Sequence, residues 1–218
     1  MRTSYPSTSH HDLILTHPCA CTFCPVLLSS SVGIHSPSHG VILGLALFYG
    51  GIVQILAGMW EFKTGNTFGA LVFSSYGGFW LSYAALFIVS FGFMDGYETA
   101  SEDDINNGLG IYLLSWTIFT FLMFIASHRT TLLLFSLFFL LTITFLLLTI
   151  GRFCDNDIEL QRAGGYFGIV VALMAWYGCL AALLTKKNSF FTLPVGEMDP
   201  IYIHLGWLEA PVKDDKEE

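Results

Sequence analysis

The sequence predicts an all-α integral membrane protein built as a bundle of transmembrane helices. Of its 218 residues 54% are hydrophobic and only 12% are charged, a composition far more apolar than that of a soluble domain. Apolar runs of about 20 residues, the length that crosses a bilayer, alternate with short polar turns. The net charge of −8 leaves no basic surface for phosphates, so we expect no nucleic-acid partner.

The N-terminal 39 residues contain the weakest candidate span. The stretch Leu13–Ile34 is only intermittently apolar, and Pro18 and Pro25 interrupt it. Each proline removes a backbone donor that lipid cannot replace, at a cost of roughly 3 kcal/mol inside a helix. The polar run Ser4–Asp12 is unlike a signal peptide, so we expect none. We interpret residues 1–39 as an atypical region that holds the remnant of a first helix.

Five further runs carry no formal charge and are each long enough to cross a bilayer. They are Val41–Trp60, Thr67–Phe93, Leu109–Ala126, Thr131–Gly151 and Ala163–Leu184. A charged turn at Glu61, an acidic loop that ends at Asn106 and Asn107, a turn at Arg129 and a polar loop from Asp155 to Arg162 separate them. We therefore predict a transmembrane bundle over residues 40–187 and a C-terminal tail over 188–218.

The distribution of lysine and arginine predicts how the bundle is oriented. One side carries Lys63, Arg129, Lys186 and Lys187, and the other carries only Arg152 and Arg162. The side with more lysine and arginine residues should be cytoplasmic. We expect a multi-pass protein of the plasma membrane with both termini in the cytoplasm.

The five runs contain hydroxyl and amide groups but no charged group, which argues against a pump that needs an intramembrane carboxylate. The polar residues at membrane depth are Gln54, Ser74, Ser75, Tyr76, Ser82, Tyr83, Ser90, Ser115, Thr117, Thr120, Thr142 and Thr144. Such groups can hydrogen-bond a small polar solute without burying a charge.

The densest polar and aromatic patch runs from Ser74 to Tyr83. Helical spacing places Tyr76, Phe79, Trp80 and Tyr83 on one face. This stripe is either a packing surface or a pore face with an aromatic gate.

Glycines at four-residue spacing predict seams of close helix packing. These pairs are Gly40 with Gly44, Gly65 with Gly69, and Gly164 with Gly168.

No motif indicates an enzyme, a metal or a cofactor. The cluster His17, Cys19, Cys21 and Cys24 lacks a second ligand pair, and an odd total of five cysteines does not form a disulfide framework. The sequence contains no phosphate-binding loop and no nucleophile elbow.

Three motifs occur in order: Phe-Tyr-Gly-Gly from Phe48, Gly-Asn-Thr-Phe-Gly from Gly65, and Ser-Tyr-Gly-Gly-Phe-Trp from Ser75. Together with Asn188–Glu197, they make the chain resemble the acetate uptake transporter family of fungi and bacteria, the YaaH type. The resemblance is continuous from about Gly40 to Glu197.

The resemblance implies six transmembrane helices per chain and a homohexamer with a conduit in each protomer. It also implies a narrow constriction that includes Tyr76 and Leu141, with Ala175 as a further pore position. The motif Asn-Pro-Ala-Pro-Leu-Gly-Leu, with which family members begin their first helix, occurs nowhere in this sequence. We therefore hypothesise a divergent or mispredicted start.

The expected function is proton-linked transport of acetate and other small monocarboxylates. Tyr76, Ser74, Ser75 and Gln54 would supply hydrogen-bond donors, while Leu141 and Phe79 would shape and dry the constriction. The alternatives are export of ammonium or of a neutral small solute, and a non-transporting membrane protein with a sensing or structural role.

Overall fold

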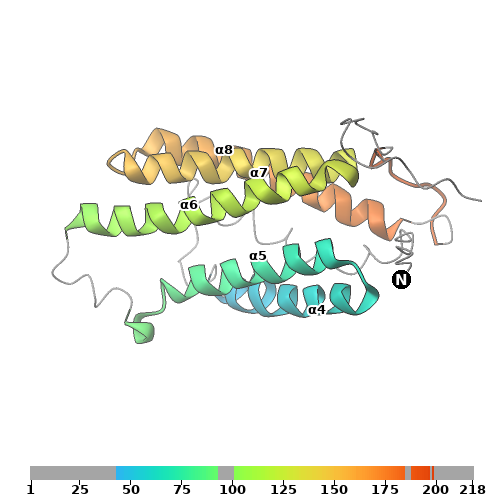
Figure 1. Ribbon diagram of the computed structural model, residues 1–218, viewed down its shortest axis with the longest axis horizontal. Coiled ribbons are helices and arrows are strands. Elements are labelled where there is room, and N and C mark those ends of the chain that lie inside the picture. The colour runs from blue at the N-terminus through green and yellow to red at the C-terminus, as the bar shows by residue number, and fades with distance from the viewer. Residues whose placement is uncertain (1–42, 93–100, 185–187, 197, 199–218) are drawn as a thin grey trace, which may run out of the picture.

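The computed structural model describes residues 43–92, 101–184, 188–196 and 198, which are almost entirely helical (Figure 1). The helices are η1 (Ala46–Val53), α4 (Gln54–Thr64), α5 (Thr67–Ala85), η2 (Val89–Phe91), α6 (Glu102–Ala126), η4 (Ser127–Arg129), α7 (Leu132–Phe153) and α8 (Ile158–Leu183). The stretch Leu13–Ile34 and the His17 cysteine cluster lie outside the described residues.

The helices form two groups, as Figure 1 shows. In one group, α5 packs against η1 and α4; in the other, α7 packs against both α6 and α8. The groups meet through large aromatic side chains that α5 directs toward α6 and α7. The turn between α4 and α5 and the connection between α6 and α7 lie at the same end of the bundle.

Among the described residues, four helical segments are long and apolar enough to cross a membrane: Leu43–Thr64, Glu102–Arg129, Leu132–Phe153 and Ile158–Leu183. The remaining predicted run, Thr67–Phe93, forms α5, which ends at Ala85, earlier than predicted; it is 19 residues long and contains several serines, glycines and tyrosines. Its buried residues include Gly69, Phe73, Tyr76 and Trp80. A helix enclosed by other helices can carry such polar groups because they face protein rather than lipid.

The outer faces of the long helices are apolar. Large exposed hydrophobic side chains include Ile111, Ile118, Phe121, Leu122 and Ile125 on α6 and Leu173, Trp176 and Leu180 on α8. A soluble monomer rarely exposes so much contiguous apolar surface, whereas a bilayer solvates it. The prediction of an all-α integral membrane protein is thus confirmed.

The start of α6 lies seven residues before the predicted one. Ser101 and Asp104 form a capping box, in which the Asp104 backbone N–H donates to Ser101 Oγ at 3.3 Å and the Ser101 N–H donates to Asp104 Oδ2 at 3.1 Å. The acidic first turn also suits the positive end of the helix dipole. The predicted turn at Asn106 and Asn107 is therefore wrong, because both residues are helical.

The start of α8 is also earlier than predicted. Asp155 and Asn156 adopt positive φ angles of 49° and 56° and make a tight turn. The Asp157 carboxylate then accepts hydrogen bonds from the backbone N–H groups of Glu159 and Leu160 at 2.8 and 3.4 Å. This N-cap starts the helix at Ile158, so the predicted polar loop is shorter.

The prediction that no charged group lies within a span is wrong for the segment Leu43–Thr64, which contains η1 and α4. Helix α4 continues through Glu61 to Thr64, and the Glu61 side chain is 0% exposed. Its Oε2 accepts a hydrogen bond from Asn66 Nδ2 at 2.5 Å, and Asn66 Oδ1 in turn accepts from the Gly69 N–H at 3.0 Å. Gly65, with a φ of 87°, ends α4 and is not a packing glycine.

Replacing Asn66 by alanine should lower the thermal stability of the chain in detergent. The variant loses the N-cap of α5, worth about 1 kcal/mol. It also loses a donor to a buried carboxylate, worth about 1.5–3 kcal/mol. Asn66→Asp keeps the cap but places a second carboxylate beside Glu61, so it should be destabilised too. Unfolding temperatures equal to the wild type for both variants would show that this contact contributes nothing.

The segment before Met198 docks on the start of α7. The backbone N–H groups of Leu132 and Leu133, which have no partner within their own helix, donate to the carbonyls of Gly196 and Val195 at 2.6 and 3.2 Å. The Tyr177 hydroxyl of α8 donates to the Pro194 carbonyl at 2.8 Å. This part of the predicted tail therefore caps a helix of the bundle.

Candidate functional site

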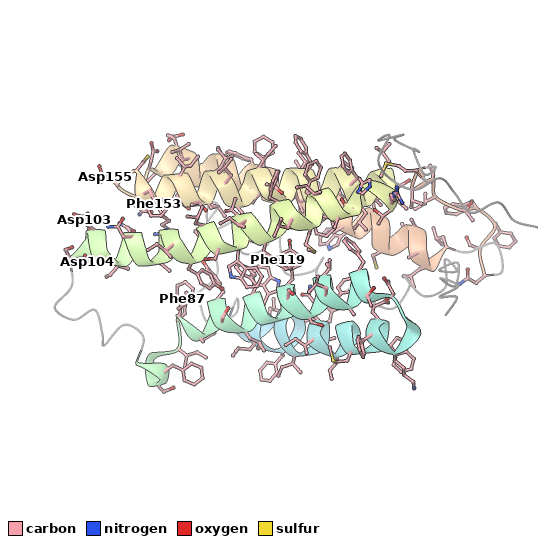
Figure 2. All side chains as sticks on the ribbon, in the orientation of Figure 1. Phe87, Asp103, Asp104, Phe119, Phe153 and Asp155 are labelled. Carbon is pink, nitrogen blue, oxygen red and sulfur yellow. The ribbon has the colours of Figure 1, made fainter. Side chains whose placement is uncertain are left out.

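The candidate site is a cluster of aromatic side chains where α5, α6 and α7 meet. Phe79 on α5 packs edge to face against Trp116 of α6 and Phe145 of α7, with ring centroids 5.1 and 5.4 Å apart. It also stacks on Tyr112 at 6.0 Å. Figure 2 shows the neighbouring Phe119 in the space between α6 and α5.

Tyr76 lies in the same cluster, one helical turn from Phe79. Its ring packs against Phe119 of α6 at 5.7 Å and stacks on Phe138 of α7 at 6.4 Å, and it lies 6.2 Å from Trp116. Its hydroxyl forms a buried hydrogen bond of 2.9 Å with Thr120 Oγ1. The ring is thereby held on several sides, and its polar end is hydrogen-bonded across to α6.

Two further hydroxyl pairs connect the helices around this cluster. Thr117 and Thr149 join α6 to α7 with 3.0 Å between their hydroxyl oxygens, and both residues are buried. Ser82 and Tyr112 join α5 to α6 at 2.8 Å, and Tyr112 also donates to the Phe79 carbonyl at 3.2 Å. None of the side chains in these contacts carries a formal charge, so the site can offer hydrogen bonds but no ion pair.

Leu141 is half-buried on α7 and packs against this aromatic cluster. Three of the seven predicted site residues, Tyr76, Phe79 and Leu141, therefore gather in one place. Ala175 is half-buried on α8, which packs against the same helix, α7.

Gln54 and Ser74 lie at the seam between α4 and α5. Gln54 is 1% exposed, and its Oε1 has no hydrogen-bond partner among the described residues. The Ser74 hydroxyl donates to the Ala70 carbonyl at 2.6 Å and lies against Gly58 of α4. Because residues two positions apart point to opposite sides of a helix, Ser74 and Tyr76 face different neighbours. Ser75 is half-buried between them in sequence.

Sequence reasoning did not select as site residues the partners that complete the cluster, and it named only Thr120 among them, as one polar residue at membrane depth. These are Tyr112, Trp116, Phe119 and Thr120 of α6 and Phe138, Phe145 and Thr149 of α7. A usable signal was the 3–4 residue spacing of Gly110, Leu113, Thr117, Thr120 and Met123, which form the buried face of α6. In the described part of the chain, no group of three metal-ligating side chains comes together.

The chain is similar to known proteins along most of its length. The profile of the GPR1/FUN34/yaaH family matches residues 19–200. Accumulation of dyads protein 2 of Saccharomyces cerevisiae is 50% identical over 170 residues, which are 76% of this chain and 59% of that protein. Ammonia transport outward protein 2 of the same yeast is 46% identical over 167 residues, 74% of this chain and 58% of that protein.

The chain covers a larger share of a bacterial relative than of the yeast relatives. The succinate-acetate/proton symporter SatP of Escherichia coli is 37% identical over 159 residues, 72% of this chain and 80% of SatP. A solved structure of the bacterial acetate channel SatP matches with a TM-score of 0.75 and 33% identity, over 85% of this chain and 98% of that one.

The chain spans less than two thirds of the length of the yeast relatives. The match nevertheless includes all five helical runs predicted from the sequence. The fold, the profile and the relatives agree that this multi-pass membrane protein belongs to the GPR1/FUN34/yaaH family.

Proposed function

We propose that the chain carries acetate and other small monocarboxylates across the plasma membrane, linked to proton movement, along a path that passes Tyr76. The observation that carries this proposal is the buried, uncharged cluster of aromatic rings and hydroxyls around Tyr76, in a chain that matches the acetate channel SatP.

The chemistry of the cluster suits a small carboxylate. The ion is charged at neutral pH, so crossing a region without lysine or arginine requires hydroxyl donors along the path or protonation at its mouth. The Tyr76 phenol is a donor of this kind. Phe79 and Leu141 surround it with apolar surface, and a drier surrounding strengthens each hydrogen bond to the solute.

The amide of Gln54 would serve the protonated acid. Its buried Oε1 is an unused acceptor among the described residues, and a carboxylic acid has one O–H to donate. Ser74, Ser75 and Ala175 would line adjoining parts of the path, with Ser74 on the α4 side.

The charge distribution supports a cytoplasmic position for the C-terminus, and a sixth crossing before Val41, as the family resemblance implies, would place the N-terminus on the same side. Lys63 and Arg129 lie near the connections at one end of the bundle, while Asp103, Asp104 and Asp155 lie at the other (Figure 2). Lysine and arginine favour the cytoplasmic side. We further propose a homohexamer, in which part of the exposed apolar surface packs against neighbouring protomers.

The test is uptake of labelled acetate by cells that lack their own carrier, at acidic and at neutral external pH. Saturable uptake that is faster at acidic pH supports the proposal. Normal surface expression without flux would contradict it and favour a sensing or structural role.

A second candidate function is export of ammonium, because a relative with 46% identity is named for outward ammonia transport. The same uncharged hydroxyls could solvate ammonia. Release of ammonium that acetate neither stimulates nor inhibits would favour this function, whereas competition between the two solutes would place both on one path.

Replacing Leu141 by alanine should admit larger acids. The change removes apolar volume beside the Tyr76 cluster, and an apolar site discriminates by about 1–3 kcal/mol per methylene. We therefore expect lactate to compete with labelled acetate on the order of tenfold better. Leu146→Ala, an exposed leucine on the same helix, is the control and should leave competition unchanged. Identical competition profiles for the wild type and Leu141→Ala would remove Leu141 from the path.

A further inference from the structure

Arg152 brings a positive charge to one end of the aromatic cluster. It lies half-buried in the last turn of α7, beside Phe153, at the end of the bundle where Figure 2 also shows Asp155. Its Nη1 donates a hydrogen bond of 3.3 Å to Asn106 Oδ1 on α6. An arginine near the end of a membrane helix usually extends toward water. This contact instead turns the guanidinium toward the neighbouring helix of the bundle.

The charge of Arg152 is not neutralised by a carboxylate of the described chain. Within the residues that the structure describes, Arg152 makes the one hydrogen bond to Asn106 and no ion pair. A guanidinium has several N–H donors in a fixed fork, so donors remain for an anion. Three carboxylates at the same end are engaged elsewhere: Asp104 in the capping box of α6, Asp157 in the N-cap of α8, and Glu159 in an ion pair with Arg162 at 2.9 Å.

Tyr83 connects this charge with the candidate site. The guanidinium of Arg152 is close enough to Tyr83 of α5 for its charge to act on the phenol. The Tyr83 ring stacks on Phe79, with 5.7 Å between the ring centroids, and Phe79 lies about one helical turn from Tyr76. Arg152, Tyr83, Phe79 and Tyr76 therefore follow one another from the end of the bundle toward its middle.

We propose that Arg152 is an anion-selecting residue at the outer mouth of the substrate path. Its planar fork binds the carboxylate of an arriving acid in the ionised form, and the anion then passes to the phenols of the cluster. The same charge repels ammonium at this mouth. This inference rests on the proposed function, in which acetate passes Tyr76, and on the outward position of this end of the bundle.

The test compares labelled acetate uptake by Arg152→Gln and Arg152→Lys at low external ionic strength, normalised to the amount of protein at the cell surface. Glutamine keeps an amide donor and removes the charge, so the KM for acetate should rise about fivefold while the maximal rate per copy stays within about twofold. Lysine keeps the charge without the fork, so its KM should lie between the two. Added external salt should narrow the difference between the wild type and Arg152→Gln, because salt screens the charge.

Arg162→Gln is the matched control. It removes one positive charge from the same end of the bundle, but Arg162 is 44% exposed and already pairs with Glu159. Its KM for acetate should therefore equal that of the wild type. An equal rise in KM for Arg162→Gln and Arg152→Gln would overturn the inference, since the net charge of this end would then suffice.

A second variant neutralises the guanidinium without removing it. Asn106→Asp keeps an acceptor for Arg152 and pairs its charge with a carboxylate, so the KM should rise as it does in Arg152→Gln. Because this substitution retains the contact between α6 and α7, it carries the test if Arg152→Gln does not reach the surface. A wild-type KM in Asn106→Asp would overturn the role of the charge.

The outcomes separate this inference from the proposed function. Saturable uptake by the wild type, with the same KM in Arg152→Gln at low ionic strength, overturns the role of Arg152 and leaves the function standing. A rise in KM that external salt does not reduce would also overturn it, because the loss would then not be electrostatic. A wild-type chain without saturable uptake overturns the proposed function and the anion-selecting role together.

Discussion

Replacing Tyr76 by alanine should abolish saturable acetate uptake, and replacing it by phenylalanine should lower uptake efficiency at least about tenfold. The alanine variant removes a ring that packs between α6 and α7 and leaves a cavity, at a cost of about 3–5 kcal/mol. The phenylalanine variant keeps the ring and removes only the hydroxyl. A hydrogen bond to a charged group contributes about 1.5–3 kcal/mol, which corresponds to the expected tenfold effect or more.

The measurement is labelled acetate uptake at several concentrations, with the surface amount of each variant determined in the same cells. Tyr166, an exposed tyrosine of α8, provides the control, and Tyr166→Phe should transport like the wild type. If Tyr76→Phe takes up acetate at the wild-type rate with equal surface expression, the phenol does not contact the substrate. A loss confined to Tyr76→Ala would then reflect packing alone.

The sequence predicted the middles of the helices better than their ends. The apolar runs that became α7 and α8 were evident because a helix facing lipid must be apolar over many residues. Their ends depend on local hydrogen bonds that hydropathy does not measure. The capping box at Ser101 and the N-cap at Asp157 extended α6 and α8 into segments that were interpreted as polar loops.

Burial was the second property that the sequence did not reveal. Glu61 was placed in a charged turn because a carboxylate next to an apolar run usually marks its end. In the folded chain the side chain turns toward the start of α5, where the Asn66 amide donates to it. A pattern along one helix cannot show that a neighbouring helix begins beside it.

The sequence predicted the residues that α5 contributes to the candidate site, but not those that α6 and α7 contribute. Helical periodicity placed Tyr76 and Phe79 on one face of α5, and both are buried in the aromatic cluster. Their partners Trp116, Phe138 and Thr120 come from α6 and α7, and the meeting of these faces depends on tertiary packing. The pore role of each predicted residue remains a prediction for the uptake experiments.

The glycine pair Gly77 and Gly78 should respond in opposite ways to the same added methyl group. A Cβ at Gly77 would lie 2.6 Å from Ile55 Cγ1 and 3.0 Å from the Gly51 carbonyl oxygen of the facing helix. A Cβ at Gly78 would meet no atom within 4 Å. Gly77→Ala should therefore destabilise the chain by about 1–3 kcal/mol through overpacking. Gly78→Ala should be neutral or stabilising by up to about 1 kcal/mol, because alanine favours the helix.

Thermal unfolding in detergent measures the difference, and each kcal/mol corresponds to about 2–4 °C in a chain of this size. The atoms near Gly77 also predict how far a second change can restore stability. Ile55→Ala removes the nearest side-chain atom, but the Ile55 nitrogen and the Gly51 oxygen stay at 3.0 Å because they belong to the backbone. The double variant should therefore recover only part of the stability lost by Gly77→Ala. Full recovery would show that side chains set the distance between the helices, and equal unfolding temperatures for Gly77→Ala and Gly78→Ala would show that α4 and α5 do not approach this closely.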